Sequence, residues 1–188
     1  MKKKELIFMA MALMLLTACG KSEGEQQVTA NYTVNIDGER TYISDDDEQV
    51  VAAKETAMGY LTNYANKDYT KQGNMEILPY LADKLRTTYE QKNTVGVNQE
   101  SIRNYELIEK MESYEISYVQ MYTLYGQPAA DIFLSYTVQI ETATEAYLSS
   151  LGMSAGDRYK RTLTLKLEDT EEGWKINKAS LGAREVIK

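Results

Sequence analysis

Hydrophobic residues recur with helical spacing in two segments of the first half of the chain. Over residues 48–66, at 100° per residue, the apolar side chains share one arc of about 160°, interrupted only by Lys54. This pattern predicts a helix with one buried face. Over residues 78–89 the spacing i, i+3, i+4, i+7, i+11 predicts a second helix, in which Pro79 is tolerable only near the first turn.

Beyond Gly96 the apolar period changes from 3.6 to 2, which is typical of half-buried antiparallel strands. The alternation predicts strands over 105–111, 115–125, 131–141 and 158–168. Residues 142–157 predict a short helical turn followed by a glycine-rich loop. The polar turn at 171–173 predicts a hairpin, whose returning strand starts with Trp174 as a core anchor.

Helices followed by an antiparallel sheet predict an α+β fold, with N-terminal helices packed on one face of the sheet. Residues 57–69 resemble the opening helix and turn of the nuclear transport factor 2-like (cystatin-like) fold. Residues 163–167 with 173–176 resemble its closing hairpin. The resemblance covers residues 48–182 and implies a curved antiparallel sheet of about four to six strands around a conical cavity. Residues 183–188 are then a C-terminal tail.

The start of the chain carries targeting signals. Three lysines follow Met1, and the apolar stretch over residues 6–16 is too short to span a bilayer, which needs about 20 apolar residues. The following Leu-Thr-Ala-Cys-Gly at 16–20 resembles the lipobox of bacterial lipoproteins. The resemblance implies that residues 1–18 are a signal peptide that is removed and that Cys19, the only cysteine, becomes the lipidated first residue. We therefore expect acyl chains such as palmitate to anchor the protein on the extracytoplasmic face of the cell membrane.

Residues 19–47 are polar and predict a tether, although the alternation of Tyr32, Val34 and Ile36 leaves a short edge strand open. The acidic run over 45–48 suits a helix start, because negative charge is favourable at a helix N-terminus. It lacks the alternating spacing and the glycine of a calcium loop. We expect no metal site there.

Composition excludes several kinds of chemistry. The 188 residues include no His and one Cys, which excludes Ser-His-Asp and Cys-His relays, His-containing zinc sites and an intramolecular disulfide. Of 21 basic and 28 acidic residues, the signal peptide holds three and one, so the mature chain carries 18 against 27, a net charge of −9. An acidic surface is repelled by phosphate backbones, so we expect no nucleic-acid partner. No motif calls for a cofactor.

Two carboxyl groups are candidates for acid–base chemistry. Relatives in the nuclear transport factor 2-like family that resemble ketosteroid isomerase use carboxylic acids and a tyrosine in an apolar cavity. Asp131, however, has the opposite strand parity to Ile132 and Leu134, and Asp83 lies on the wet side of its expected helix. We therefore expect no catalysis, and an isomerase or dehydratase is the less favoured alternative.

Tyrosine is abundant, with fifteen residues against two Phe. Phenol rings with hydroxyls suit sugars, peptides or amphipathic small molecules, although they also replace Phe in a core. Strand parity predicts that several line the concave side of the sheet. The candidate cavity residues are Tyr60, Tyr64, Tyr118, Tyr122 and Tyr136.

The expected function is a non-catalytic binding or assembly module of the cell envelope. Its partners would be the membrane, through lipid on Cys19, and an envelope protein or a second copy of the chain, through the sheet. A lipoprotein that binds a small molecule, a peptide or a sugar in an aromatic cavity is the alternative.

Overall fold

The computed structural model describes residues 30–34 and 38–187, so the expected signal peptide and the expected lipidation site, Cys19, lie outside the described residues. The strands are β1 (Ala30–Val34), β2 (Arg40–Tyr42), β3 (Lys67–Asp68), β4 (Ile108–Leu124), β5 (Gln127–Thr142), β6 (Arg158–Thr170) and β7 (Gly173–Ile187). The helices are α1 (Glu48–Ala65), α2 (Asp83–Gln91), α3 (Thr94–Asn104), α4 (Glu145–Leu151) and the short 3₁₀ helix η1 (Leu78–Tyr80).

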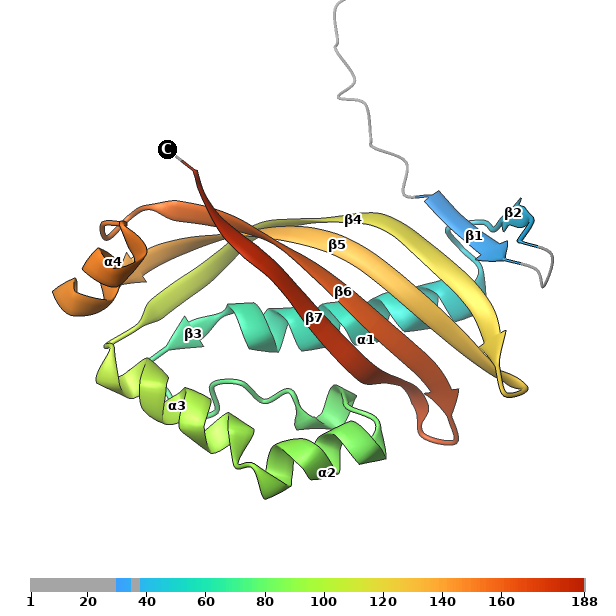
Figure 1. Cartoon of the computed structure of the whole chain (residues 1–188), viewed down its shortest axis with the longest axis horizontal. Helices are drawn as coiled ribbons and strands as arrows, with labels where there is room; N and C mark the ends of the chain where they lie inside the picture. Colours follow the sequence, from blue (N-terminus) through green and yellow to red (C-terminus); the bar gives the residue numbers. More distant parts are fainter. Residues whose placement is uncertain (1–29, 35–37, 188) are drawn as a thin grey trace, which may run out of the picture.

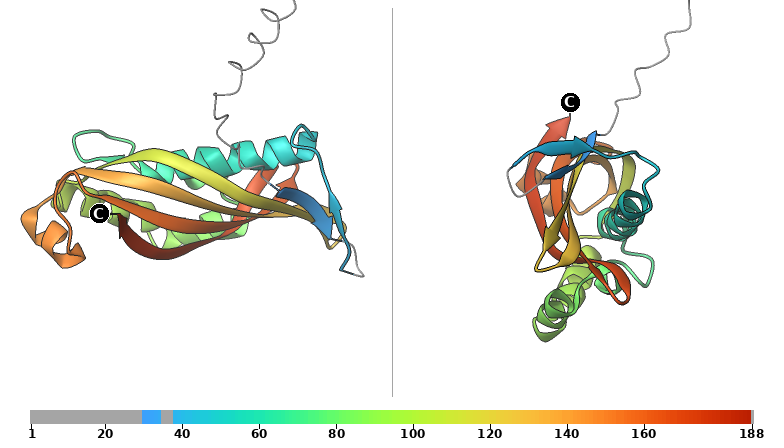
Figure 2. Two further views of the ribbon diagram at one scale, coloured as in Figure 1. Left: turned by 90° about the horizontal axis from the view of Figure 1, so that it is seen from above. Right: turned by 90° about the vertical axis from the view of Figure 1, so that its right-hand side faces the viewer.

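The strands form one curved sheet that bends around α1 (Figure 1). Its order is β2-β1-β4-β5-β6-β7, and β3 pairs with β4 off this path. Views from above and from one end show α1 along the sheet, with α2 and α3 at one side of the molecule (Figure 2). The hydrophobic core lies between α1 and the inner face of the long strands.

Helix α1 confirms the predicted helix over residues 48–66. It begins where the Asp47 carboxylate accepts hydrogen bonds from the backbone N–H groups of Gln49 and Val50, at 3.0 and 3.2 Å. It ends at Asn66, whose backbone N–H donates to the Thr62 carbonyl. Its buried face consists of Val50, Ala53, Ala57, Tyr60, Leu61 and Ala65. Asp47 of the acidic run therefore serves as the helix cap.

Strands β5 and β6 follow the predicted alternation. Ile132, Leu134 and Val138 on β5 are fully buried, and they face the helix with Leu163 and Leu165 of β6. The intervening polar residues point to the other face, as the strand period of two requires. The side chain of Trp174 is 6% exposed and belongs to the same core, so its predicted anchoring role is confirmed.

The expected nuclear transport factor 2-like fold is wrong. The sheet has seven strands and is mixed, because β1 runs parallel to β4. Two strands precede the first helix, and the helices lie mostly in the middle of the chain; of the described residues, 46% are in strands and 31% in helices. The extra strands are short: the alternation that left an edge strand open marked β1, at Tyr32 and Val34, whereas β2 and β3 were not predicted.

Other boundaries also differ from the sequence prediction. The two strands predicted over 105–125 are one continuous strand, β4, and the preceding helix α3 was not predicted. The predicted second helix is divided into η1, which has Pro79 in its first turn, and α2. Strand β7 extends to Ile187, into the segment expected to be a tail.

Strand β1 ties part of the expected tether into the sheet. Asn31 and Tyr32 are 2% and 7% exposed, and the Asn31 amide donates to Asp45 at 2.7 Å. The backbone N–H of Ile43 donates to the Asn31 carbonyl at 3.0 Å. Residues 30–34 are therefore part of the folded unit.

We expect removal of residues 19–34 to lower the free energy of unfolding by more than about 2 kcal/mol, because it exposes Val119 and Met121 and removes the burial of Tyr32. Urea unfolding followed by circular dichroism measures this difference. Removal of residues 19–29 alone is the control and should leave the midpoint unchanged. Equal midpoints for both truncations would contradict the role assigned to β1.

Candidate ligand-binding site

A buried ion pair lies at the end of α1. Residue Lys67 on β3 is directly opposite Glu109 on β4 in the antiparallel ladder, so their side chains share one face of the sheet. The Lys67 ammonium forms an ion pair with Glu109 Oε2. The Glu109 side chain is 0% exposed and that of Lys67 is 16% exposed. A buried carboxylate of this kind requires a partner charge, which Lys67 supplies.

A second cation approaches the same carboxylate from β7. Arg184 Nη2 lies 3.9 Å from Glu109 Oε1 and donates to the Tyr147 hydroxyl at 3.5 Å. The guanidinium carbon lies 4.3 Å from the centre of the Tyr159 ring. Among the described residues, neither Glu109 Oε1 nor Arg184 Nε has a hydrogen-bond partner. We call Lys67, Glu109 and Arg184 the buried charge cluster; its net charge is positive.

Two buried phenols surround this cluster. Burial raises the pKa of Tyr159 above its ordinary value, and the nearby Glu109 carboxylate raises it further, against the opposing effect of Arg184. Burial likewise raises the pKa of Tyr136, and Tyr64 adds to this effect. Both hydroxyls therefore stay protonated at neutral pH and cannot supply a compensating negative charge.

A polar pocket of about 410 Å³ opens beside the ion pair. Its walls are the last turn of α1, strand β3, the loop over residues 71–75 and the start of β4. Lys67 and Glu109 form part of its lining, together with Thr62 and Gln72. Thr62 and Gln72 are exposed at the pocket, so the Thr62 hydroxyl and the Gln72 amide are open to water or to a ligand.

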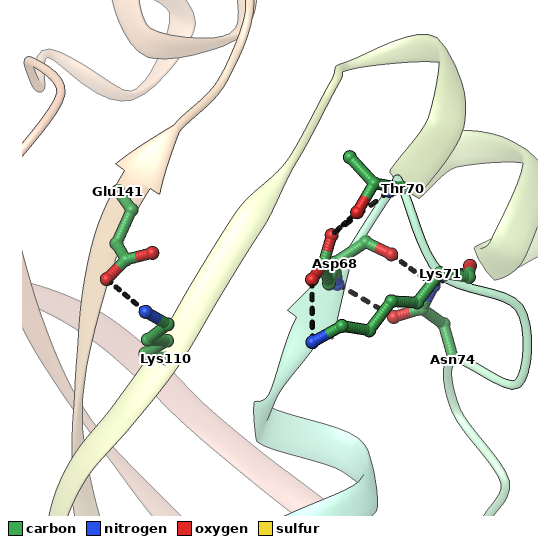
Figure 3. A network of polar contacts seen from close by, with 6 residues as sticks. All are labelled: Asp68, Thr70, Lys71, Asn74, Lys110 and Glu141. Atoms are coloured by element: carbon green, nitrogen blue, oxygen red, sulfur yellow. Dashed lines mark hydrogen bonds and ion pairs between the residues drawn. The ribbon is translucent and has the colours of Figure 1, made fainter.

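The loop that closes this pocket is held by Asp68 (Figure 3). One carboxylate oxygen accepts from the Thr70 N–H and hydroxyl, at 3.0 and 2.6 Å, and the other lies 3.0 Å from Lys71 Nζ. The Asn74 side chain accepts from the Asp68 N–H at 2.8 Å and donates to the Asp68 carbonyl at 2.7 Å. The Thr70 and Lys71 contacts lower the pKa of Asp68 to about 2. The loop is thus organised without a ligand.

A smaller cavity of about 170 Å³ adjoins the polar pocket. Tyr64, Tyr105 and Tyr147 line it, and the rings of Tyr105 and Tyr147 stack with centroids 4.6 Å apart. We call it the tyrosine cavity. Lys67 and Met75 line both the tyrosine cavity and the polar pocket, so these two side chains lie between the two spaces.

The structure separates the five tyrosines predicted to line one cavity. Tyr60 and Tyr136 are core residues at 2% exposure, and Tyr64 stacks on Tyr60 at 5.7 Å. Of the five, only Tyr64 lines the tyrosine cavity, and none lines the polar pocket. The other two, Tyr118 and Tyr122, lie on the opposite face of the sheet from Tyr136.

A β-bulge causes this separation. Ile116 is opposite Leu134 on the inner face, but a register shift puts Tyr118 opposite Phe133, two rings that stack at 5.5 Å. A bulge adds one residue to a strand and so reverses the parity of all that follow. Tyr122 consequently donates to Asp131 on the outer face, at 2.8 Å.

The two carboxylates considered from the sequence lie away from both cavities. Asp131 forms an ion pair with Lys166 at 2.7 Å, on the outer face of the sheet. Asp83 is exposed at the start of α2 and pairs with Arg86. The buried carboxylate is Glu109 instead, which sequence reasoning missed. Its strand parity with Leu107 and Met111 was the available signal.

Comparisons with known proteins add little. No family model matches the chain, and no curated protein matches it. Among solved structures, the intermembrane space region of the chloroplast protein ARC6 is similar at 16% identity and a TM-score of 0.45, over 71% of this chain and 95% of that one. That likeness is too slight to define a fold.

Two further properties concern the described residues alone. None of their helices is both long enough and apolar enough to cross a membrane. In the part of the chain that the structure describes, no three Asp, Glu or Cys side chains gather as metal ligands. The candidate site therefore consists of the buried charge cluster and the two cavities beside it.

Proposed function

We propose that this chain is a lipid-anchored extracytoplasmic binding protein, without catalysis of its own, that takes up a small polar solute in the polar pocket. The observation that carries the proposal is the position of Lys67. Its ammonium lies between two cavities. Among the described residues, it uses one of its three N–H donors, in the bond to Glu109. The pocket volume of about 410 Å³ lies within the range of small-molecule sites.

The environment of Glu109 favours binding over catalysis. A general base must reach the proton that it removes, either directly or through one water. Glu109 is 0% exposed, and its Oε2 is held by Lys67. The carboxylate therefore orients the lysine and offsets its charge, which is a positioning role.

The edge of the sheet disfavours the assembly alternative. Strand β7 is the last strand of the order, and its end exposes Leu181, Val186 and Ile187 at 37–43%. Its pairing with β6 has two register shifts, next to Leu163 and Leu167. Bulges of this kind twist an edge strand and discourage pairing with another chain. The exposed apolar side chains suit a contact with another chain, but the two register shifts oppose continuous strand pairing. We therefore rank an envelope partner or a second copy on this edge below solute binding.

A panel of solutes tests the binding proposal on the full mature chain in detergent. We expect at least one class among neutral sugars, amino acids, organic acids and polyamines to raise the melting temperature, because a ligand that binds only the folded state stabilises it. Thr62→Trp should abolish the shift by filling the pocket from an exposed position.

Glu55→Trp is the matched control, since Glu55 is exposed on the same helix and outside the pocket lining. Its melting temperature should still rise with the same solutes. If no solute class raises the melting temperature of the wild-type protein, the binding role is refuted. If both tryptophan variants abolish the rise equally, the solute binds outside the polar pocket.

The membrane anchor rests on the lipobox resemblance at residues 16–20. We expect Cys19→Ser to leave the precursor unprocessed and unlipidated, whereas the wild-type chain begins at Cys19 and partitions with membranes. Intact-protein mass spectrometry reports the acyl mass on the first residue. Two or more acyl chains are expected, because one chain binds a membrane only marginally. A wild-type mature chain without acyl mass would show that the anchor is wrong.

A further inference from the structure

We infer that the solute is an anion, a small sugar acid whose carboxylate binds the Lys67 ammonium and whose hydroxylated body occupies the polar pocket. This inference rests on the proposed binding function and names the class of ligand. Three features of the described residues carry it: the charge of the buried cluster, the unused donors of Lys67, and the exposed polar groups of the pocket wall.

The charge argument starts from an imbalance. In the buried charge cluster, two cations share one carboxylate, with the Arg184 and Lys67 side chains 21% and 16% exposed. Arg184 lines neither cavity and offsets the charge of Glu109 from its other oxygen, so Lys67 is the cation of the cluster that faces the polar pocket. The other two lysines of the polar pocket are balanced one to one: Lys71 lies 3.0 Å from Asp68, and Lys110 lies 2.6 Å from Glu141 (Figure 3).

The surplus positive charge is therefore local to Lys67 and Arg184. It occurs in a chain whose net charge is −7, so it does not reflect a generally basic surface. Both cations are largely but not fully removed from water, and a partly buried positive charge is stabilised when an anion accompanies it. A carboxylate from the ligand would provide that anion.

The hydrogen-bonding argument concerns one atom. Lys67 Nζ pairs with Glu109 and lies 5.7 Å from the centre of the Tyr64 ring, which leaves two N–H donors unused among the described residues. A carboxylate accepts at both oxygens and forms short, charge-assisted bonds with an ammonium. A neutral hydroxyl would satisfy a donor but would leave the surplus charge uncompensated.

The pocket wall indicates what the rest of the ligand carries. Thr62 and Gln72 present an exposed hydroxyl and an exposed amide to the pocket, which suits a body with several hydroxyl groups. The tyrosine cavity, at about 170 Å³, falls below the usual range of ligand pockets. The body therefore fits the polar pocket, on the side of Lys67 where α1 ends.

Matched pairs of probes test the inference by isothermal titration calorimetry on the full mature chain. The pairs are glucuronate with glucose, galacturonate with galactose, and gluconate with sorbitol. We expect at least one acid to bind about tenfold or more tightly than its neutral partner, as for a hydrogen bond to a charged group. Its affinity should fall as salt rises from about 50 to about 500 mM, because salt screens the attraction.

Variants locate the binding group. Lys67→Met combined with Glu109→Leu removes the ammonium without leaving a buried carboxylate, and it should abolish the preference for the acid. Lys67→Arg keeps a cation and should retain the preference, which keeps the test valid if the double variant fails to fold. Lys92→Met is the matched control, because Lys92 is exposed and lies outside both cavity linings, and the preference should change less than about twofold. Lys71→Met tests whether the loop side of the pocket binds the acid instead.

The possible failures are distinguishable. If neutral solutes bind but no acid exceeds its neutral partner, the anion inference is overturned while the binding function stands. If no solute of any class binds, both fail. If Lys71→Met removes the preference as fully as the Lys67 variants, the anion binds at the loop and the assignment to Lys67 is overturned.

Discussion

Lys67→Met is expected to lower the free energy of unfolding by about 3–5 kcal/mol, because it leaves the Glu109 carboxylate buried without its bonded cation. Arg184 cannot replace the lost partner without rearrangement, since its nearest nitrogen is 3.9 Å from Glu109 Oε1 and makes no hydrogen bond to it. Urea unfolding, followed by circular dichroism with the m-value monitored, measures the loss.

The double variant shows whether the stability loss comes from the unpaired buried carboxylate or from the lost side-chain contact. Lys67→Met with Glu109→Leu should recover most of the stability, because replacing both members of a buried ion pair by apolar residues of similar volume is often neutral or stabilising. Lys71→Met removes an exposed pair and should cost no more than about 1 kcal/mol. Similar losses for the Lys67 and Lys71 single variants would mean that the Glu109 carboxylate is hydrated in solution.

Trp174→Ala is the second substitution with a large expected effect, a loss of about 3–5 kcal/mol. The indole is 6% exposed and contributes to the core beside Ile176, immediately after the turn that joins β6 to β7. Truncation would leave a cavity between α1 and the sheet, enough to unfold a domain of marginal stability. The loss is again measured by urea unfolding.

Fluorescence provides an independent check, because Trp174 is the only tryptophan of the chain. A buried indole should emit at short wavelength and resist quenching by acrylamide. Val186→Ala is the control on the same strand, since Val186 is 37% exposed and its truncation should cost far less. A red-shifted, freely quenched emission together with an unchanged unfolding midpoint in Trp174→Ala would place the indole at the surface.

The local pattern of hydrophobic residues was sufficient to predict the helix and strands whose buried residues recur with a regular period. The apolar face of α1 and the alternation along β5 and β6 were predicted because each side chain there points as its own period requires. Asp131 was correctly placed on the wet face, and Trp174 in the core, by the same reasoning. These features depend only on neighbours along the chain.

The tertiary structure decided the features that depend on pairing between distant segments. The parallel addition of β1 to β4 made the sheet mixed, and the bulge after Ile116 turned Tyr118 and Tyr122 to the outer face. No periodicity within one strand encodes which strand lies beside it or where a residue is inserted.

The candidate site depends on such pairing throughout. Lys67, Glu109 and Arg184 come from three strands. They meet because β3 pairs with the start of β4 and because the end of β7 brings Arg184 within 3.9 Å of Glu109. Read singly along the sequence, each is an ordinary charged residue in a polar context. Their burial arises when the sheet closes around α1. Only then is water removed from the charges, so that their burial costs free energy and marks them as a candidate site.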